Sequence, residues 1–99
     1  MKIKYTNEFL KDIDNLKEYA LLFSDESAVE KRFSKIIDRI ESLAKTPNIG
    51  AFVKSRLLCE TEHRYLVCER YLVIYIPVGE IVKIVRIFDG RQDWQQFFV

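Results

Sequence analysis

Residues 71–90 have the sequence YLVIYIPVGEIVKIVRIFDG, in which two apolar runs flank the dipeptide Gly79-Glu80. Runs rich in valine, isoleucine and aromatic residues that end at turn-forming residues are typical of strands. We therefore predict one strand over Tyr71–Val78, a tight turn, and a second strand over Ile81–Phe88. Together they form a β-hairpin, which Asp89-Gly90 closes.

Three further strands are predicted before this hairpin in the sequence. Lysine and apolar residues alternate over residues 2–5, which is the period of a short strand near the start of the chain. From residue 52 onward the period is again two, and we predict strands over Phe52–Leu58 and Tyr65–Arg70.

The segment between the first two predicted strands has helical periodicity instead. Apolar residues recur at spacings of 4, 3, 4 and 3 in two stripes, which predicts two amphipathic helices. The first stripe consists of Phe9, Ile13, Leu16, Ala20 and Phe23. The second consists of Val29, Phe33, Ile36, Ile40 and Leu43. Thr6 is predicted to cap the first helix. The second helix begins near Asp25 or at Ser27, which has capping-box spacing with Glu30. Pro47 ends the second helix.

These elements predict an α+β fold with the order β-α-α-β-β-β-β, in one domain that spans residues 1–99. The two helices form a hairpin that packs on one face of a twisted, mostly antiparallel sheet. We expect the opposite face to carry the functional side chains. The end of the chain is densely apolar and must pack against something; it contains Trp94, Phe97, Phe98 and Val99.

Composition limits the classes of function. The net charge is only +1, but most positive charges of the second half are arginines, which suit carboxylate and phosphate recognition: Arg56, Arg64, Arg70, Arg86 and Arg91. Cys59 and Cys68 are predicted to be reduced thiols. We expect no cofactor and no metal site, because the ligand spacings are absent, and a cytoplasmic location, because no signal peptide or membrane-length apolar run is apparent.

The order and spacing of three segments resemble those of the RelE/ParE family of bacterial type II toxins. The segments are Arg70–Tyr75, Ile84–Trp94, and the helix exit Leu43–Gly50. The last strand of the family often ends in a run of the type Arg, two apolar residues, His, Gly and Arg, and Asp89 stands at the His position here. The resemblance implies a toxin that acts on a macromolecule and is neutralised by a cognate antitoxin in a hetero-oligomer.

The family divides by mechanism, and the sequence favours one branch. RelE-like members cleave mRNA on the ribosome, whereas ParE-like members bind DNA gyrase. Leu72 stands where RelE-like members carry an arginine, and neither Trp94 nor Phe97 can transfer a proton, so we favour a ParE-like toxin that is not an enzyme. A metal-independent ribonuclease remains the alternative, with the catalytic set Lys54, His63, Arg64 and Arg91. A degenerate, non-toxic member that only binds the antitoxin is a third possibility.

For the binding function we predict that the target contacts residues near the end of the sheet. Arginine and tryptophan are enriched at binding hot spots. The predicted target-binding set is Arg64, Arg86, Asp89, Arg91, Asp93 and Trp94. An alternative for the same residues is structural, with an Asp89–Arg91 salt bridge that anchors the tail and Trp94 in the core. His63, in the loop Glu60-Thr61-Glu62-His63, is expected to be an exposed turn residue.

Overall fold

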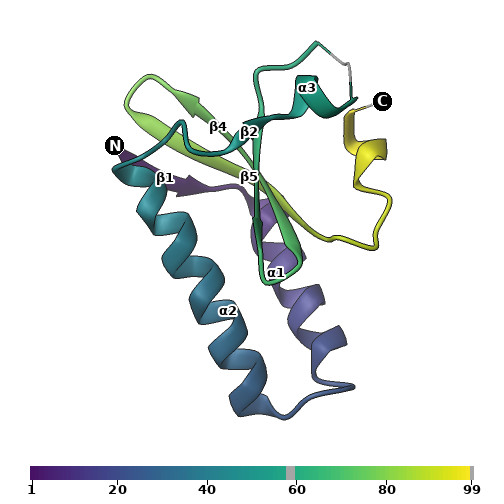
Figure 1. Ribbon diagram of the computed structural model, residues 1–99. Helices are drawn as coiled ribbons and strands as arrows, with labels where there is room; N and C mark the ends of the chain where they lie inside the picture. Colours follow the sequence, from purple (N-terminus) through teal and green to yellow (C-terminus); the bar gives the residue numbers. More distant parts are fainter. Residues whose placement is uncertain (58–59, 99) are drawn as a thin grey trace.

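The computed structural model describes residues 1–57 and 60–98, and it confirms the predicted α+β fold (Figure 1). The strands are β1 (Lys2–Tyr5), β2 (Ala51–Phe52), β3 (Arg64–Cys68), β4 (Tyr71–Val78) and β5 (Ile81–Asp89). The α-helices are α1 (Asn7–Ala20), α2 (Glu26–Glu41) and α3 (Val53–Leu57). The described residues also contain two 3-10 helices, η1 (Ser42–Ala44) and η2 (Trp94–Phe98).

The five strands form one sheet in the order β1-β5-β4-β3-β2. β1 pairs with β5 in parallel, and all the other pairs are antiparallel. The predicted hairpin is confirmed, since β4 occupies the predicted residues and β5 is one residue longer than predicted. Because β4 lies in the middle of the sheet, both its faces need cover.

The helical hairpin covers one face of the sheet (Figure 1). Thr6 caps α1 by accepting a hydrogen bond from the Phe9 amide, and Asp25 caps α2, so the second helix begins nearer Asp25 than Ser27. The predicted stripe of α2 is buried throughout. In the stripe of α1, however, the prediction for Phe23 is wrong: the residue lies beyond the helix end and is 75% exposed.

The opposite face is also covered, which corrects the expectation that it is free for function. A second apolar cluster lies there, formed by Val53, Leu72, Ile74, Phe88 and Trp94. α3 and η2 supply its outer layer and lie near one another at the carboxyl end of the chain in Figure 1. The apolar tail therefore packs on its own sheet.

The predicted strand over Phe52–Leu58 is wrong for most of its length. β2 has only two residues, and the chain then turns into α3. Val53 and Leu57 are four residues apart, and the helical turn of α3 places both of them on one face, against the second cluster. Leu58 lies outside the described residues, as do Cys59 and Val99.

The turn between β3 and β4 has an unusual backbone. β3 ends at Cys68 rather than at Arg70, and Cys68 pairs with Tyr71 across a two-residue loop. Both loop residues have positive φ, 51° at Glu69 and 71° at Arg70, as a type I′ turn requires. This left-handed conformation favours glycine and asparagine, so the two long side chains are held at an energetic cost.

Gly50 lies where the chain passes closest to the sheet. A Cβ atom on this residue would lie 2.5 Å from the Tyr75 hydroxyl oxygen and 2.7 Å from the Tyr65 carbonyl oxygen. The Gly50 amide donates a 2.8 Å hydrogen bond to the hydroxyl of Tyr75, which is fully buried. This contact fixes the segment that leads from the helices into β2.

We predict that Tyr75→Phe lowers the free energy of unfolding by about 1–3 kcal/mol, because the buried Gly50 amide loses its acceptor. Tyr5→Phe is the matched control. The Tyr5 hydroxyl donates to Glu41 at an exposed site, so its loss should cost less than about 0.5 kcal/mol. Urea unfolding of both variants measures the difference, and equal losses would contradict the assigned role of the Gly50 contact.

We also predict that Arg70→Gly raises the free energy of unfolding, by up to about 1 kcal/mol, because glycine adopts a φ of 71° without steric strain. The matched control is Arg39→Gly in the exposed part of α2, which should lose about 0.5–1 kcal/mol. Thermal and urea unfolding of the two variants should therefore shift in opposite directions. A loss of stability in Arg70→Gly would contradict the turn geometry.

Candidate functional site

Arg86 is held at the edge of β5 by a carboxylate from α1. Its Nε and Nη2 atoms donate to the two oxygens of Asp12 at 2.6 and 2.9 Å, and Asp12 Oδ2 also accepts from the Ile87 amide at 3.1 Å. Asp12 thus occupies the edge beyond the last β1 pair, Tyr5 with Ile84. The hydrogen bond to Asp12 raises the pKa of Arg86, which keeps the guanidinium charged.

The guanidinium of Arg86 also contacts the tail. Its Cζ atom lies 4.8 Å from the ring centroid of Phe88 and 5.5 Å from that of Phe97. The side chain is 27% exposed. Arg86 therefore joins α1, β5 and η2, and only a part of it is open to a partner.

Asp89 and Arg91 form the salt bridge that the structural alternative predicted. The buried Asp89 carboxylate accepts from Arg91 Nε at 3.3 Å, from Nη2 at 3.2 Å and from the Arg91 amide at 3.0 Å. Burial alone would raise the pKa of Asp89, but the hydrogen bonds from Arg91 and the charges of Arg91 and Arg70 lower it overall. The Arg91 side chain is 67% exposed, so one side of its guanidinium is available to a partner.

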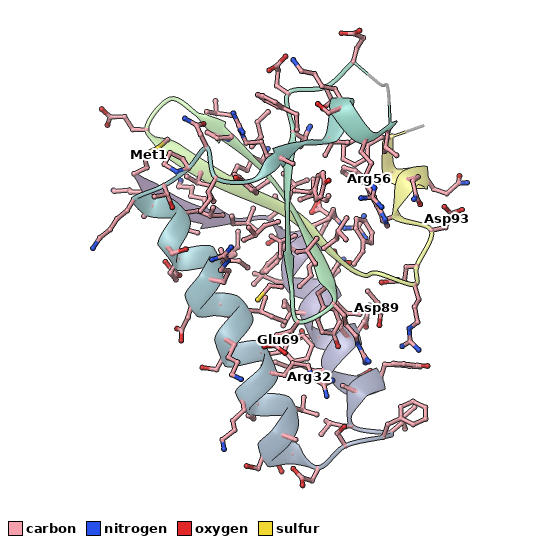
Figure 2. The ribbon with its side chains drawn as sticks, viewed as in Figure 1. Met1, Arg32, Arg56, Glu69, Asp89 and Asp93 are labelled. Atoms are coloured by element: carbon pink, nitrogen blue, oxygen red, sulfur yellow. The ribbon has the colours of Figure 1, made fainter. Side chains whose placement is uncertain are left out.

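The other two residues predicted near the tail have different environments. Trp94 is only 4% exposed and packs in the second cluster, with ring centroids 6.1 Å from Tyr65 and 6.4 Å from Phe98. The guanidinium of Arg56, from α3, lies over the Trp94 ring. Figure 2 shows Arg56 beside η2. Asp93 is exposed and accepts a 3.1 Å hydrogen bond from Gln96.

Arg64 and Lys54 meet at the ring of Phe52, beside the β2–β3 pair. The Arg64 Cζ atom lies 3.9 Å from the ring centroid, and its Nη1 donates to the carbonyls of Gly50 at 2.7 Å and Asn48 at 3.1 Å. Lys54 Nζ lies 4.7 Å from the same centroid and 3.6 Å from the Glu62 carboxylate. Backbone carbonyls therefore use part of the donor capacity of Arg64.

His63 lies in a loop, as predicted, but it is half-buried rather than exposed. Its Nδ1 is 2.6 Å from the Thr61 hydroxyl, and its ring meets the ring of Phe98 edge-on at 5.6 Å. Burial lowers its pKa, and the charge of Lys83 lowers it further. The imidazole is therefore neutral at pH 7.

The four candidate ribonuclease residues do not converge. Tyr75 pairs with Arg64, whereas Tyr71 pairs with Asp89, the partner of Arg91. Four residues of strand separate these positions by roughly 13 Å. Lys54, His63 and Arg64 thus lie beside the middle of β4, and Arg91 lies near its first residue. Leu72 is buried in the second cluster.

The structure brings together three arginines that sequence analysis did not group. Arg32, Arg70 and Arg91 line a hollow of about 240 Å³ beside the connection between α1 and α2. They come from α2, from the β3–β4 turn and from the segment after β5. No sequence spacing links such positions, and only the positive charge of each residue could have drawn attention to them.

In the part of the chain that the structure describes, residues 1–57 and 60–98, no group of three or more His, Cys, Asp or Glu residues is placed to hold a metal ion. None of the helices in this part of the chain combines the length and apolar character needed to cross a membrane. Cys68 is a free thiol whose pKa is raised, chiefly by burial.

Comparisons with known proteins agree with the fold. The family model described as the ParE toxin of type II toxin–antitoxin system parDE matches residues 3–94. A chain of the chromosomal ParDE system from P. aeruginosa has a TM-score of 0.75 and 21% identity, over 90% of this chain and 95% of that chain. A conserved hypothetical protein from Helicobacter pylori has a TM-score of 0.46 and 17% identity, over 88% of this chain and 91% of that one. The comparison with curated proteins gave no match.

We predict that Asp89→Asn makes the free energy of unfolding less dependent on pH in the acidic range. The folded-state pKa of Asp89 is below its ordinary value, so its stabilising effect is complete above about pH 4 and is lost as the pH falls through the folded-state pKa. The variant should be less stable than the parent at pH 7, and the gap should narrow toward about pH 3. Urea unfolding along this pH range tests it, with Asp38→Asn on the exposed side of α2 as control. A gap that is constant with pH would contradict the assignment.

Proposed function

The chain belongs to the family of ParE toxins of type II toxin–antitoxin systems, and from this premise we propose that it arrests growth by binding DNA gyrase and is neutralised by a cognate antitoxin. It would act in the cytoplasm, where its target lies, as part of a toxin–antitoxin hetero-oligomer. The observation that carries the proposal is the separation of the candidate catalytic residues. A site that binds needs exposed groups, whereas ribonuclease chemistry needs a base and cations around one phosphate.

Within this proposal the predicted target-binding residues have two kinds of role. Arg91 and Asp93 are exposed and would contact the target directly. Asp89, Arg86 and Trp94 would act as positioning residues, because they anchor Arg91 and the tail. Arg64 would present the remaining donors of its guanidinium beside Tyr75, in the middle of β4.

The antitoxin would occupy a different surface. β1 lies at one edge of the sheet, and an open hollow of about 460 Å³ beside it is lined by Lys4, Tyr5, Thr6, Asn7, Val78, Ile81 and Lys83. Apolar and basic groups at a strand edge suit an extended, partly acidic segment that adds a strand. A partner bound at this edge would leave Arg91 accessible beyond the opposite end of β5.

We predict that the purified protein inhibits the supercoiling of relaxed plasmid by gyrase and that its antitoxin restores the reaction. Arg91→Ala should weaken the inhibition, whereas Arg39→Ala, on the exposed part of α2, should not. The same preparations should leave mRNA on translating ribosomes intact. Cleavage of that mRNA with no effect on gyrase would overturn the proposal in favour of the ribonuclease, and expression without growth arrest would indicate the non-toxic alternative.

A further inference from the structure

We propose that the hollow lined by Arg32, Arg70 and Arg91 binds a carboxylate side chain of the target protein. This inference deepens the proposed function and rests on it. We call this site the arginine hollow. It is lined by these three arginines together with Tyr19, Ala20, Phe23 and Ser24, and its volume is about 240 Å³. A volume of this order can hold one acidic side chain.

Four segments that are distant in sequence build the arginine hollow. The end of α1 and the connection to α2 form one wall, and Arg32 of α2 lies beside them. The β3–β4 turn and the segment after β5 form the other wall. Figure 2 shows Arg32 close to the turn that carries Glu69 and to the strand end that carries Asp89. The Gly90 amide donates to the Arg70 carbonyl at 3.0 Å, which joins the turn to the end of β5.

The charges in the arginine hollow are not balanced. Its lining contains three guanidinium groups and no carboxylate. Arg91 pairs with Asp89, but across residues 1–57 and 60–98 neither Arg32 nor Arg70 has a carboxylate within the 4.0 Å of an ion pair. Like charges that converge repel one another, and a bound carboxylate would relieve this repulsion while accepting charge-assisted hydrogen bonds.

The backbone at Arg70 is an independent reason to assign a binding role to the arginine hollow. Its φ is 71°, a conformation that glycine adopts freely and that strains a residue with a long side chain. Strain of this kind is typical of functional positions. The turn therefore holds a guanidinium in the lining of the hollow at the expense of stability.

The surroundings favour a protein carboxylate over a phosphate of nucleic acid. The connection beside the hollow exposes two large apolar side chains, Leu22 at 74% and Phe23 at 75%, which suit an apolar neighbour of the acidic residue. Glu69 and Asp89 adjoin the arginines in sequence and would repel a polyanionic backbone. An acidic side chain flanked by apolar ones fits both features.

The first test uses gyrase inhibition by the full chain. Arg32→Gln and Arg70→Gly should each raise the concentration needed for half-inhibition by at least about tenfold, the loss expected for one charge-assisted contact. Arg39→Gln on the same helix is the matched control and should inhibit as the parent does. Since Arg70→Gly is expected to be more stable than the parent, unfolding cannot explain a loss of its activity. Unchanged inhibition by both variants, with an active parent, would overturn the inference alone.

The second test is independent of the target. Arginine Nε resonances of the full chain would be followed by NMR during titration with acetyl-Leu-Glu-Phe-amide and with acetyl-Leu-Gln-Phe-amide. The signals of Arg32 and Arg70 should shift with the acidic peptide only. A parent protein that fails to inhibit gyrase would overturn the proposed function. If the acidic peptide also left the Arg32 and Arg70 signals unchanged, the inference about the arginine hollow would be overturned as well. Stronger shifts with inorganic phosphate or a DNA duplex would overturn the choice of a protein carboxylate.

Discussion

Burial of β4 on both faces is the constraint on which the rest of the structure depends. All five residues from Tyr71 to Tyr75 are buried, and they alternate between the two apolar clusters. A strand of this kind is stable only between two layers, as in sheets that are covered on both sides. The helical hairpin supplies one layer. The other must come from the chain after β5 and from the short segment before β3, and this is why the tail folds back as η2.

This constraint also decides which residues remain available for function. The second layer needs Trp94 as an apolar side chain, so Trp94 anchors the tail instead of facing a partner. Leu72 packs against the same layer. An arginine at that position would have to displace this packing or bury a charge. The sheet face thus offers little room for phosphate chemistry, and the accessible polar groups gather at the ends of the strands.

Local patterns predict the elements well but not the contacts that join them. The hairpin, the helical stripes and the cap at Thr6 all follow from spacings of a few residues, and the structure confirms them. α3 was missed because one turn of helix leaves only two apolar positions, Val53 and Leu57, whose spacing is hidden by the neighbouring Phe52. The Asp12–Arg86 pair spans 74 residues, and no local pattern can indicate it.

The arginines of the second half illustrate why the candidate site was only partly predictable. Residue type indicates the capacity to bind an anion, but tertiary structure decides whether that capacity is already used. Asp12 accepts two hydrogen bonds from Arg86, and backbone carbonyls accept from Arg64. Arg91 keeps an exposed face although it is paired, and Arg70 extends from a strained turn. Since recognition needs guanidinium groups whose donors are not already taken, the proposed partner surface consists of Arg32, Arg70 and the exposed side of Arg91 rather than of every arginine in the second half of the chain.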